Sequence, residues 1–179
     1  KHLHQCARPE WAVNYVNYKR AKDHVKNQTD VEAFKEFIQE ECQKVETFYL
    51  LMMEKLRENG EHLNGLMGEG GTSKQGSIAS TVKLSWNHTE DIRSFCDFCH
   101  LNSEGIRKSL KKYDKANKGS GKVELKGEYF SSLKDKYAFF KYSEDLRYIV
   151  QQCASLWVEA HPPAAAGGAL TLEQLLGEL

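Results

Sequence analysis

GIRKSLKKYDKANK, residues 105–118, is the stretch of sequence that decides the fold. Four of its lysines are spaced i, i+3, i+4 and i+7, which places them on one stripe of an α-helix. They are Lys108, Lys111, Lys112 and Lys115. Ile106, Leu110 and Tyr113 fall on the opposite stripe. The stretch therefore predicts a helix with an apolar back, packed against the protein, and a cationic front.

Positive charge is concentrated in and just after this stretch. From Arg107 to Lys126 there are eight Lys or Arg against two acidic residues, whereas the whole chain carries 25 of each and is neutral. Like charges one helical turn apart cost roughly 0.2–0.5 kcal/mol per pair, which interspersed acidic residues would avoid. A concentrated positive face is typical of a site for a polyanion. On spacing alone, a solvated lysine face that binds nothing remains the alternative.

Length and composition predict one globular domain. The 179 residues are 40% hydrophobic, which suits a single modest core over residues 1–160. Residues 161–179 are expected to form a linker and the start of a further helix. The sequence has no apolar run near the ~18 residues of a membrane span and no secretory signal. It begins with Lys1, so we expect its natural start to be missing. Five scattered cysteines are typical of reduced thiols in the cytosol.

Several helices are expected before the lysine-rich one. The first runs from Pro9 to about Lys26, because proline suits the first turn of a helix. Tyr18 and Lys22 lie four residues apart in it, so a phenol and an ammonium share one face. A tyrosine at the edge of the core beside a surface lysine is the alternative interpretation.

A second, long helix is expected from Asp30 to about Asn59, where bulky apolar residues recur at three- and four-residue steps. Glycine and serine are frequent in residues 60–80, which predicts a flexible connector inside the domain. A third helix, from near Thr89, should end or bend at residues 102–105. Two shorter helices are expected near the end of the domain, at about 127–137 and 144–159.

Metal, haem and catalytic sites are not favoured. The run CDFCH at residues 96–100 matches the C-x-x-C-H pattern of haem attachment, but its cysteines have core-like spacing and nothing else resembles a cytochrome. Zinc would need two further ligands. Glu36, Glu40 and Glu41 lack a neighbouring histidine and are interpreted as a solvated acidic face. We expect no cofactor, no metal and, without a nucleophile–base pair, no enzyme activity in this segment.

Three segments, in this order, resemble an SPX domain. They are PEWAVNYVNYKRAK (residues 9–22), FKEFIQEECQKVETFY (34–49) and LNSEGIRKSLKKYDK (101–115). The last is similar to the family pattern L-N-x-x-G-F-R-K-I-L-K-K-Y-D-K, except that Ser109 replaces a branched apolar residue. The family usually starts with Met-Lys-Phe, whose lysine also contacts the ligand. That contact is absent from this sequence.

The resemblance implies an all-α helical bundle with two long core helices, an N-terminal helical hairpin and two shorter C-terminal helices. It implies binding of inositol polyphosphates, with inositol pyrophosphates as the physiological ligands, and a role in reporting phosphate status to a host protein or partner. It assigns a phosphate-binding cluster to Tyr18, Lys22 and Lys112. It assigns an adjoining lysine surface cluster to Lys108, Lys111 and Lys115.

Other functions and the host remain open at this point. A ligand-independent helical protein–protein interaction module is the alternative function. Direct nucleic-acid binding is disfavoured, because the chain is neutral and its lysine stripe lacks interleaved exposed aromatic residues. For the host we expect a phosphate transporter or a polyphosphate polymerase complex, whose other domains would hold any catalytic activity. The domain is then expected at the cytosolic face of the vacuole, plasma membrane or Golgi.

Overall fold

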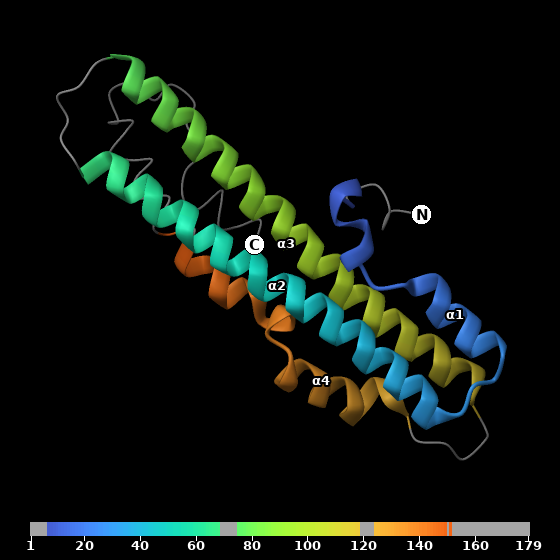
Figure 1. The fold of residues 1–179 in the computed structure, drawn as a ribbon. Coiled ribbons are helices and arrows are strands. Elements are labelled where there is room, and N and C mark those ends of the chain that lie inside the picture. The colour runs from blue at the N-terminus through green and yellow to red at the C-terminus, as the bar shows by residue number, and fades with distance from the viewer. Residues whose placement is uncertain (1–6, 69–74, 119–123, 150, 152–179) are drawn as a thin grey trace, which may run out of the picture. The chain divides into compact units, whose positions relative to one another are not determined.

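The computed structural model describes residues 7–68, 75–118, 124–149 and 151 (Figure 1). In chain order, its elements are the 3-10 helix η2 (Pro9–Asn14), α1 (Tyr18–Lys26), α2 (Val31–Gly68), α3 (Gln75–Ala116), the π-helical turn η3 (Leu125–Tyr129), α4 (Phe130–Lys136) and the 3-10 helix η4 (Ala138–Lys141). The residues from 142 to 149 are also helical. No strand occurs in this described part. The predicted all-α class, with two long helices, is confirmed.

Internal contacts divide the chain into two compact units, and α2 and α3 contribute to both. The first unit comprises residues 1–50 and 97–141, and the second comprises 51–96 and 142–179. Met52, Leu56, Leu63, Ile92, Phe95, Leu146 and Ile149 are buried residues of the second unit. All six candidate ligand-binding residues belong to the first unit, which is therefore the one described in detail below. The predicted domain end at residue 160 lies outside the described residues.

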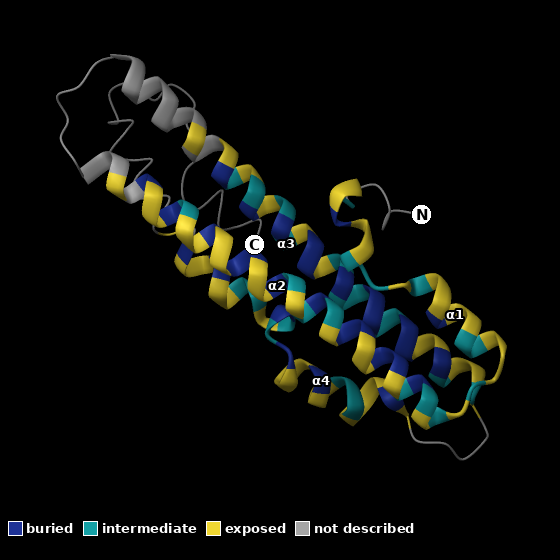
Figure 2. Ribbon diagram, viewed as in Figure 1, coloured by how far each residue is buried: buried dark blue, intermediate teal, exposed yellow. Residues whose placement is uncertain are grey.

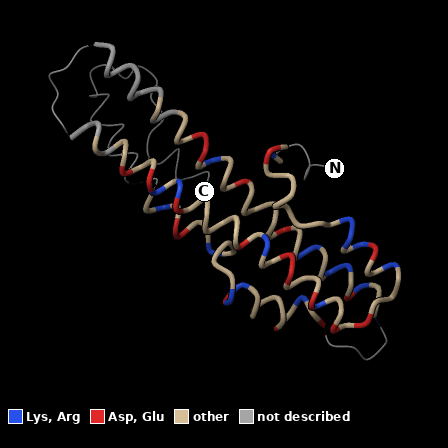
Figure 3. Tube along the Cα trace, viewed as in Figure 1, with Lys and Arg blue, Asp and Glu red and all other residues tan. Residues whose placement is uncertain are grey.

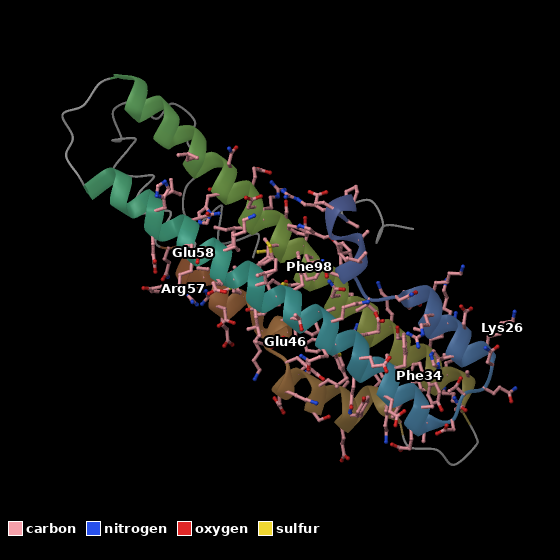
Figure 4. The ribbon with its side chains drawn as sticks, viewed as in Figure 1. Lys26, Phe34, Glu46, Arg57, Glu58 and Phe98 are labelled. Atoms are coloured by element: carbon pink, nitrogen blue, oxygen red, sulfur yellow. The ribbon has the colours of Figure 1, made fainter. Side chains whose placement is uncertain are left out.

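An aromatic cluster around Phe98 forms one end of the core of the first unit. The Phe98 ring, labelled in Figure 4, is fully buried. Its centroid lies 5.8 Å from that of Trp11, 4.9 Å from that of Tyr15 and 4.8 Å from that of Phe48. Three segments distant in sequence thus meet at one ring. Figure 2 shows buried residues along α2 and α3 in this unit and exposed residues over much of α1 and α4.

The single first helix predicted for residues 9–26 is wrong. An extended link separates η2 from α1. In this link the Val16 N–H donates to Asn102 Oδ1 at 2.7 Å, and the Asn17 N–H donates to Glu41 Oε2 at 2.7 Å. These side chains replace the backbone acceptors that a continuous helix would supply. Bonds to residues distant in sequence therefore outweigh the local helix preference, and periodicity does not reveal them.

The predicted end or bend at residues 102–105 is also wrong, because α3 passes through them without interruption. The Asn102 side chain donates to the Phe98 carbonyl at 2.7 Å, so it is satisfied within the helix. A Cβ on Gly105 would lie 3.4 Å from Val16 Cβ, so the missing side chain lets the link before α1 approach α3. Asparagine and glycine serve tertiary packing here, not helix termination.

The connector predicted at residues 60–80 is wrong for residues 60–68 and 75–80, which are helical. Helix occupies both sides of residues 69–74, which lie outside the described residues. Leu63 is buried, and a Cβ on Gly60 would lie 3.7 Å from His88 Nε2, so this part of α2 packs within the second unit. Such packing offsets the roughly 1 kcal/mol that a glycine costs inside a helix.

Carboxylates from the long helices hold the segments that follow α3. Asp114 accepts the backbone N–H groups of Leu125 and Lys126, both at 2.9 Å. Glu46, labelled in Figure 4, accepts two backbone N–H groups at the start of η4, at 3.0 and 3.1 Å. Charge-assisted bonds of this kind are stronger than neutral ones. They hold η3 to α3 and η4 to α2, on either side of α4, whose Leu133 is buried.

The shorter helices agree with expectation where the structure describes them. The helix predicted at 127–137 is present as η3 and α4, and the one predicted at 144–159 is helical as far as residue 149. Cys42 is a buried free thiol, and burial raises its pKa. Along the described helices, no stretch has the length and apolar character needed to cross a membrane.

Candidate polyanion-binding site

Helix α1 is held alongside the C-terminal half of α3 at both of its ends (Figure 1). The bond from Val16 to Asn102 fixes the chain just before α1. The Tyr113 hydroxyl donates to the Thr29 carbonyl at 3.0 Å and fixes the chain just after it. Between these two points Ala21 is buried. The two helices therefore run in the same direction, and residues on their neighbouring flanks are brought together.

The flanks of α1 have different partners. The Arg20 guanidinium lies 5.1 Å from the centroid of the Phe37 ring, and the His24 ring stacks on the same phenylalanine at 4.5 Å, so this flank packs on α2. Tyr18 and Lys22 lie on the other flank, towards α3. The Lys22 Nζ is 5.4 Å from the centroid of the Tyr18 ring. The expected sharing of one face by this phenol and ammonium is therefore present.

On α3, the flank that faces α1 is marked by Gly105, which packs against the link before α1. Lys108 and Lys112 follow Gly105 at i+3 and i+7 and so lie on that flank. Lys111 and Lys115 lie further round the helix. Three of these lysines are exposed and Lys108 is half-buried. Figure 3 shows Lys and Arg gathered on α1 and on this half of α3.

Most of the candidate lysines have no acidic partner among the described residues. These are Lys22, Lys111, Lys112 and Lys115. By contrast, on α2 Lys35 and Lys44 each pair with a glutamate one turn away, at 2.9 and 2.6 Å. Asp114, within the lysine stretch, accepts backbone N–H groups instead. Acidic side chains of the described residues therefore do not neutralise these four lysines, whose charges can interact with solvent or with a bound anion.

Glu104 is the exception on this surface, and the sequence analysis missed it. Its carboxylate accepts from Arg107 Nε at 2.7 Å and from Arg107 Nη2 at 2.8 Å, and it lies 3.5 Å from Lys108 Nζ. The hydrogen bond from Arg107, reinforced by the positive charges of Arg107 and Lys108, lowers the pKa of Glu104 to about 2 against an opposing effect of burial. The sequence did offer a signal for this ion pair, because Arg107 and Lys108 follow Glu104 at i+3 and i+4.

This ion pair predicts a pH-dependent contribution to stability. The pKa of Glu104 is about 2 in the folded chain, against an ordinary value of 4.5, so the contribution is present above pH 4.5 and is lost as the pH falls towards 2. We expect Glu104→Gln to lower the free energy of unfolding by about 0.5–1 kcal/mol at pH 7 and by almost nothing near pH 2. Urea unfolding at both pH values measures the difference.

The control is Glu32→Gln, which removes the pair with Lys35. The Glu32 side chain is 70% exposed against 26% for Glu104, so its substitution should cost less. A loss for Glu104→Gln that is the same at pH 7 and near pH 2 would contradict the assignment of this stability to the ionised carboxylate.

The arrangement of these helices is the fold of an SPX domain. A solved structure with the same fold is the SPX domain of glycerophosphodiester phosphodiesterase 1 from Chaetomium thermophilum, in complex with inositol hexakisphosphate. The match has a TM-score of 0.75 at 20% sequence identity and covers 88% of this chain and 95% of that chain. The fold implied by the sequence resemblance is thereby confirmed. No protein-family model and no curated protein sequence matches the chain.

Proposed function

We propose that this chain binds inositol polyphosphates, and inositol pyrophosphates in particular, on the surface formed by α1 and the C-terminal half of α3. The observation that carries the proposal is the set of lysines without acidic partners on two adjacent helices. Helix α1 has four basic residues and one acidic residue, and residues 104–118 have six and two, in a chain of zero net charge. The inositol hexakisphosphate bound to the neighbour of the same fold supports this ligand class.

The chemistry of the surface suits a ligand with many phosphates. Lysine ammonium groups act as point charges with rotatable donors, so they bind phosphates that point in several directions, whereas arginine favours planar, two-pronged pairing. We assign one phosphate to Tyr18, Lys22 and Lys112, with the hydroxyl as a directional donor. The neighbouring phosphates are assigned to the lysine surface cluster defined above. Orthophosphate carries too few charges to engage both clusters.

Binding would act as a signal through α1. This helix has nine residues, and hydrogen bonds to α3 hold the chain just before and just after it. A ligand that bridges α1 and α3 would favour their docked arrangement, and a partner or the host would respond to that change. We propose a phosphate transporter or a polyphosphate polymerase complex as the host, with the domain at the cytosolic face of its membrane. In this proposal the domain is a sensor, and catalysis belongs to other domains of the host.

Calorimetric titration of the folded chain tests the proposal. We expect inositol hexakisphosphate and an inositol pyrophosphate to bind at least about 100-fold more tightly than orthophosphate, because several charges are neutralised together. Raising NaCl from about 50 to 200 mM should weaken binding roughly tenfold or more for the same reason. The absence of binding to a folded chain would exclude the proposal and favour the ligand-independent interaction module.

A further inference from the structure

Glu104 occupies one end of the lysine stripe on α3. Lys108, Lys111 and Lys115 follow it at i+4, i+7 and i+11, so all four side chains lie on one face of the helix. A phosphate group that approaches this end of the stripe would come close to the Glu104 carboxylate before it came close to the lysines. Glu104 is only partly buried, with 26% of its side chain exposed, so its negative charge also repels anions in the solvent.

The same carboxylate also binds Arg107, the arginine beside the lysine stripe. The Arg107 guanidinium donates to Glu104 from Nε at 2.7 Å and from Nη2 at 2.8 Å, which uses two of its five N–H groups. A free guanidinium is the group best suited to holding a single phosphate by two parallel hydrogen bonds. Glu104 therefore offsets the charge of the guanidinium and occupies the side-on pair of donors, Nε–H and Nη2–H, that could hold a small phosphate compound, whereas the lysines further along the stripe keep their charge.

We infer that Glu104 is a specificity-determining residue, which keeps small phosphate compounds from binding and restricts the proposed site to ligands with many phosphates. The inference rests on the function proposed above and adds a regulator of ligand choice to it. A ligand with six phosphates reaches lysines beyond the influence of Glu104, so it tolerates the carboxylate. A ligand with one or two phosphates depends on the charges nearest to it, and there the Glu104 carboxylate repels it and offsets the charge of Arg107. Because the pKa of Glu104 is about 2, the carboxylate remains charged over the physiological range.

The test compares Glu104→Gln with the wild type in titrations with inositol hexakisphosphate and with inorganic pyrophosphate. The substitution keeps size and helix preference but removes the charge. We expect binding of pyrophosphate to tighten at least tenfold and that of inositol hexakisphosphate about threefold, so the selectivity falls about threefold or more. Glu32→Gln, which removes the same charge from a pair on α2, should leave both affinities within twofold.

A double-mutant cycle separates this role from a structural one. Arg107→Gln should change pyrophosphate binding little in the wild type and should reverse most of the gain in the Glu104→Gln background, because only there is the guanidinium released. Glu104→Gln should also be less stable while binding more tightly, which a merely structural residue would not produce.

Two results would overturn the inference, and they are distinguishable. If the wild type binds inositol hexakisphosphate and Glu104→Gln leaves the selectivity unchanged, Glu104 does not determine it, and the proposed function stands. If neither folded protein binds inositol hexakisphosphate, the proposed function fails and the inference fails with it.

Discussion

The triple variant Tyr18→Phe/Lys22→Ala/Lys112→Ala is expected to lose at least about 100-fold in affinity for inositol hexakisphosphate while it keeps the wild-type fold. Each of the three residues would contribute a hydrogen bond to a charged phosphate, typically worth about 1.5–3 kcal/mol. A loss of about 2.7 kcal/mol already corresponds to 100-fold. Lys22 and Lys112 are exposed, and alanine is a good helix former, so the fold should persist. Calorimetry gives the affinity, and circular dichroism checks the helix content.

The matched control is Lys134→Ala/Lys136→Ala on α4. It removes the same charge, and like Lys22 each of these lysines lies over an aromatic ring, at 5.3 Å for Lys134 and 5.1 Å for Lys136. We expect it to change the affinity by no more than about twofold, since it leaves the α1–α3 surface intact. Equal losses in the two variants would show that net charge, and not these three residues, determines binding. Unchanged binding in the triple variant would contradict the assignment of Tyr18, Lys22 and Lys112 to the ligand-binding site.

The stretch from Leu101 to Lys115 explains why so much of the fold could be predicted from sequence. Its apolar positions specify a helix by periodicity, and several of its other residues have distinct contacts in the structure. Asn102 and Gly105 hold the chain before α1, Tyr113 holds the chain after it, and Asp114 holds η3. One helix thus carries both the candidate lysines and the contacts that position its neighbours.

What the sequence did not reveal are bonds between residues distant in the chain. The extended link before α1 depends on acceptors from α2 and α3, 24 and 86 residues away, which no local pattern indicates. Asparagine and glycine usually favour helix ends, so residues 102–105 were interpreted as a break. The pairing of Glu104 with Arg107 and Lys108 has a local signal in its i, i+3 and i, i+4 spacing, but the run of positive charge drew attention away from this single carboxylate. The six candidate ligand-binding residues themselves stay a prediction.

Asn102→Ala is expected to lower the free energy of unfolding by about 2–3 kcal/mol, because Asn102 is 1% exposed and its loss leaves the Val16 N–H without an acceptor. Urea unfolding measures this cost. The control is Asn117→Ala near the end of α3, where the half-buried side chain makes the same type of bond to a carbonyl four residues back, at 2.9 Å. It should cost about 1 kcal/mol or less.

The same substitution tests whether the docking of α1 matters for binding. Without the bond from Val16 to Asn102, the link before α1 keeps its bond to Glu41 but loses the one to α3, and Tyr18 and Lys22 lie in the two turns that follow. Their positions relative to the α3 lysines then become variable, so part of the binding energy is spent on restoring the docked arrangement. We expect affinity for inositol hexakisphosphate to fall roughly tenfold in Asn102→Ala, at a temperature where the variant is folded, and to stay unchanged in Asn117→Ala. An Asn102→Ala protein that is destabilised as expected but binds like the wild type would show that the lysines of α3 suffice and that α1 does not need to be held.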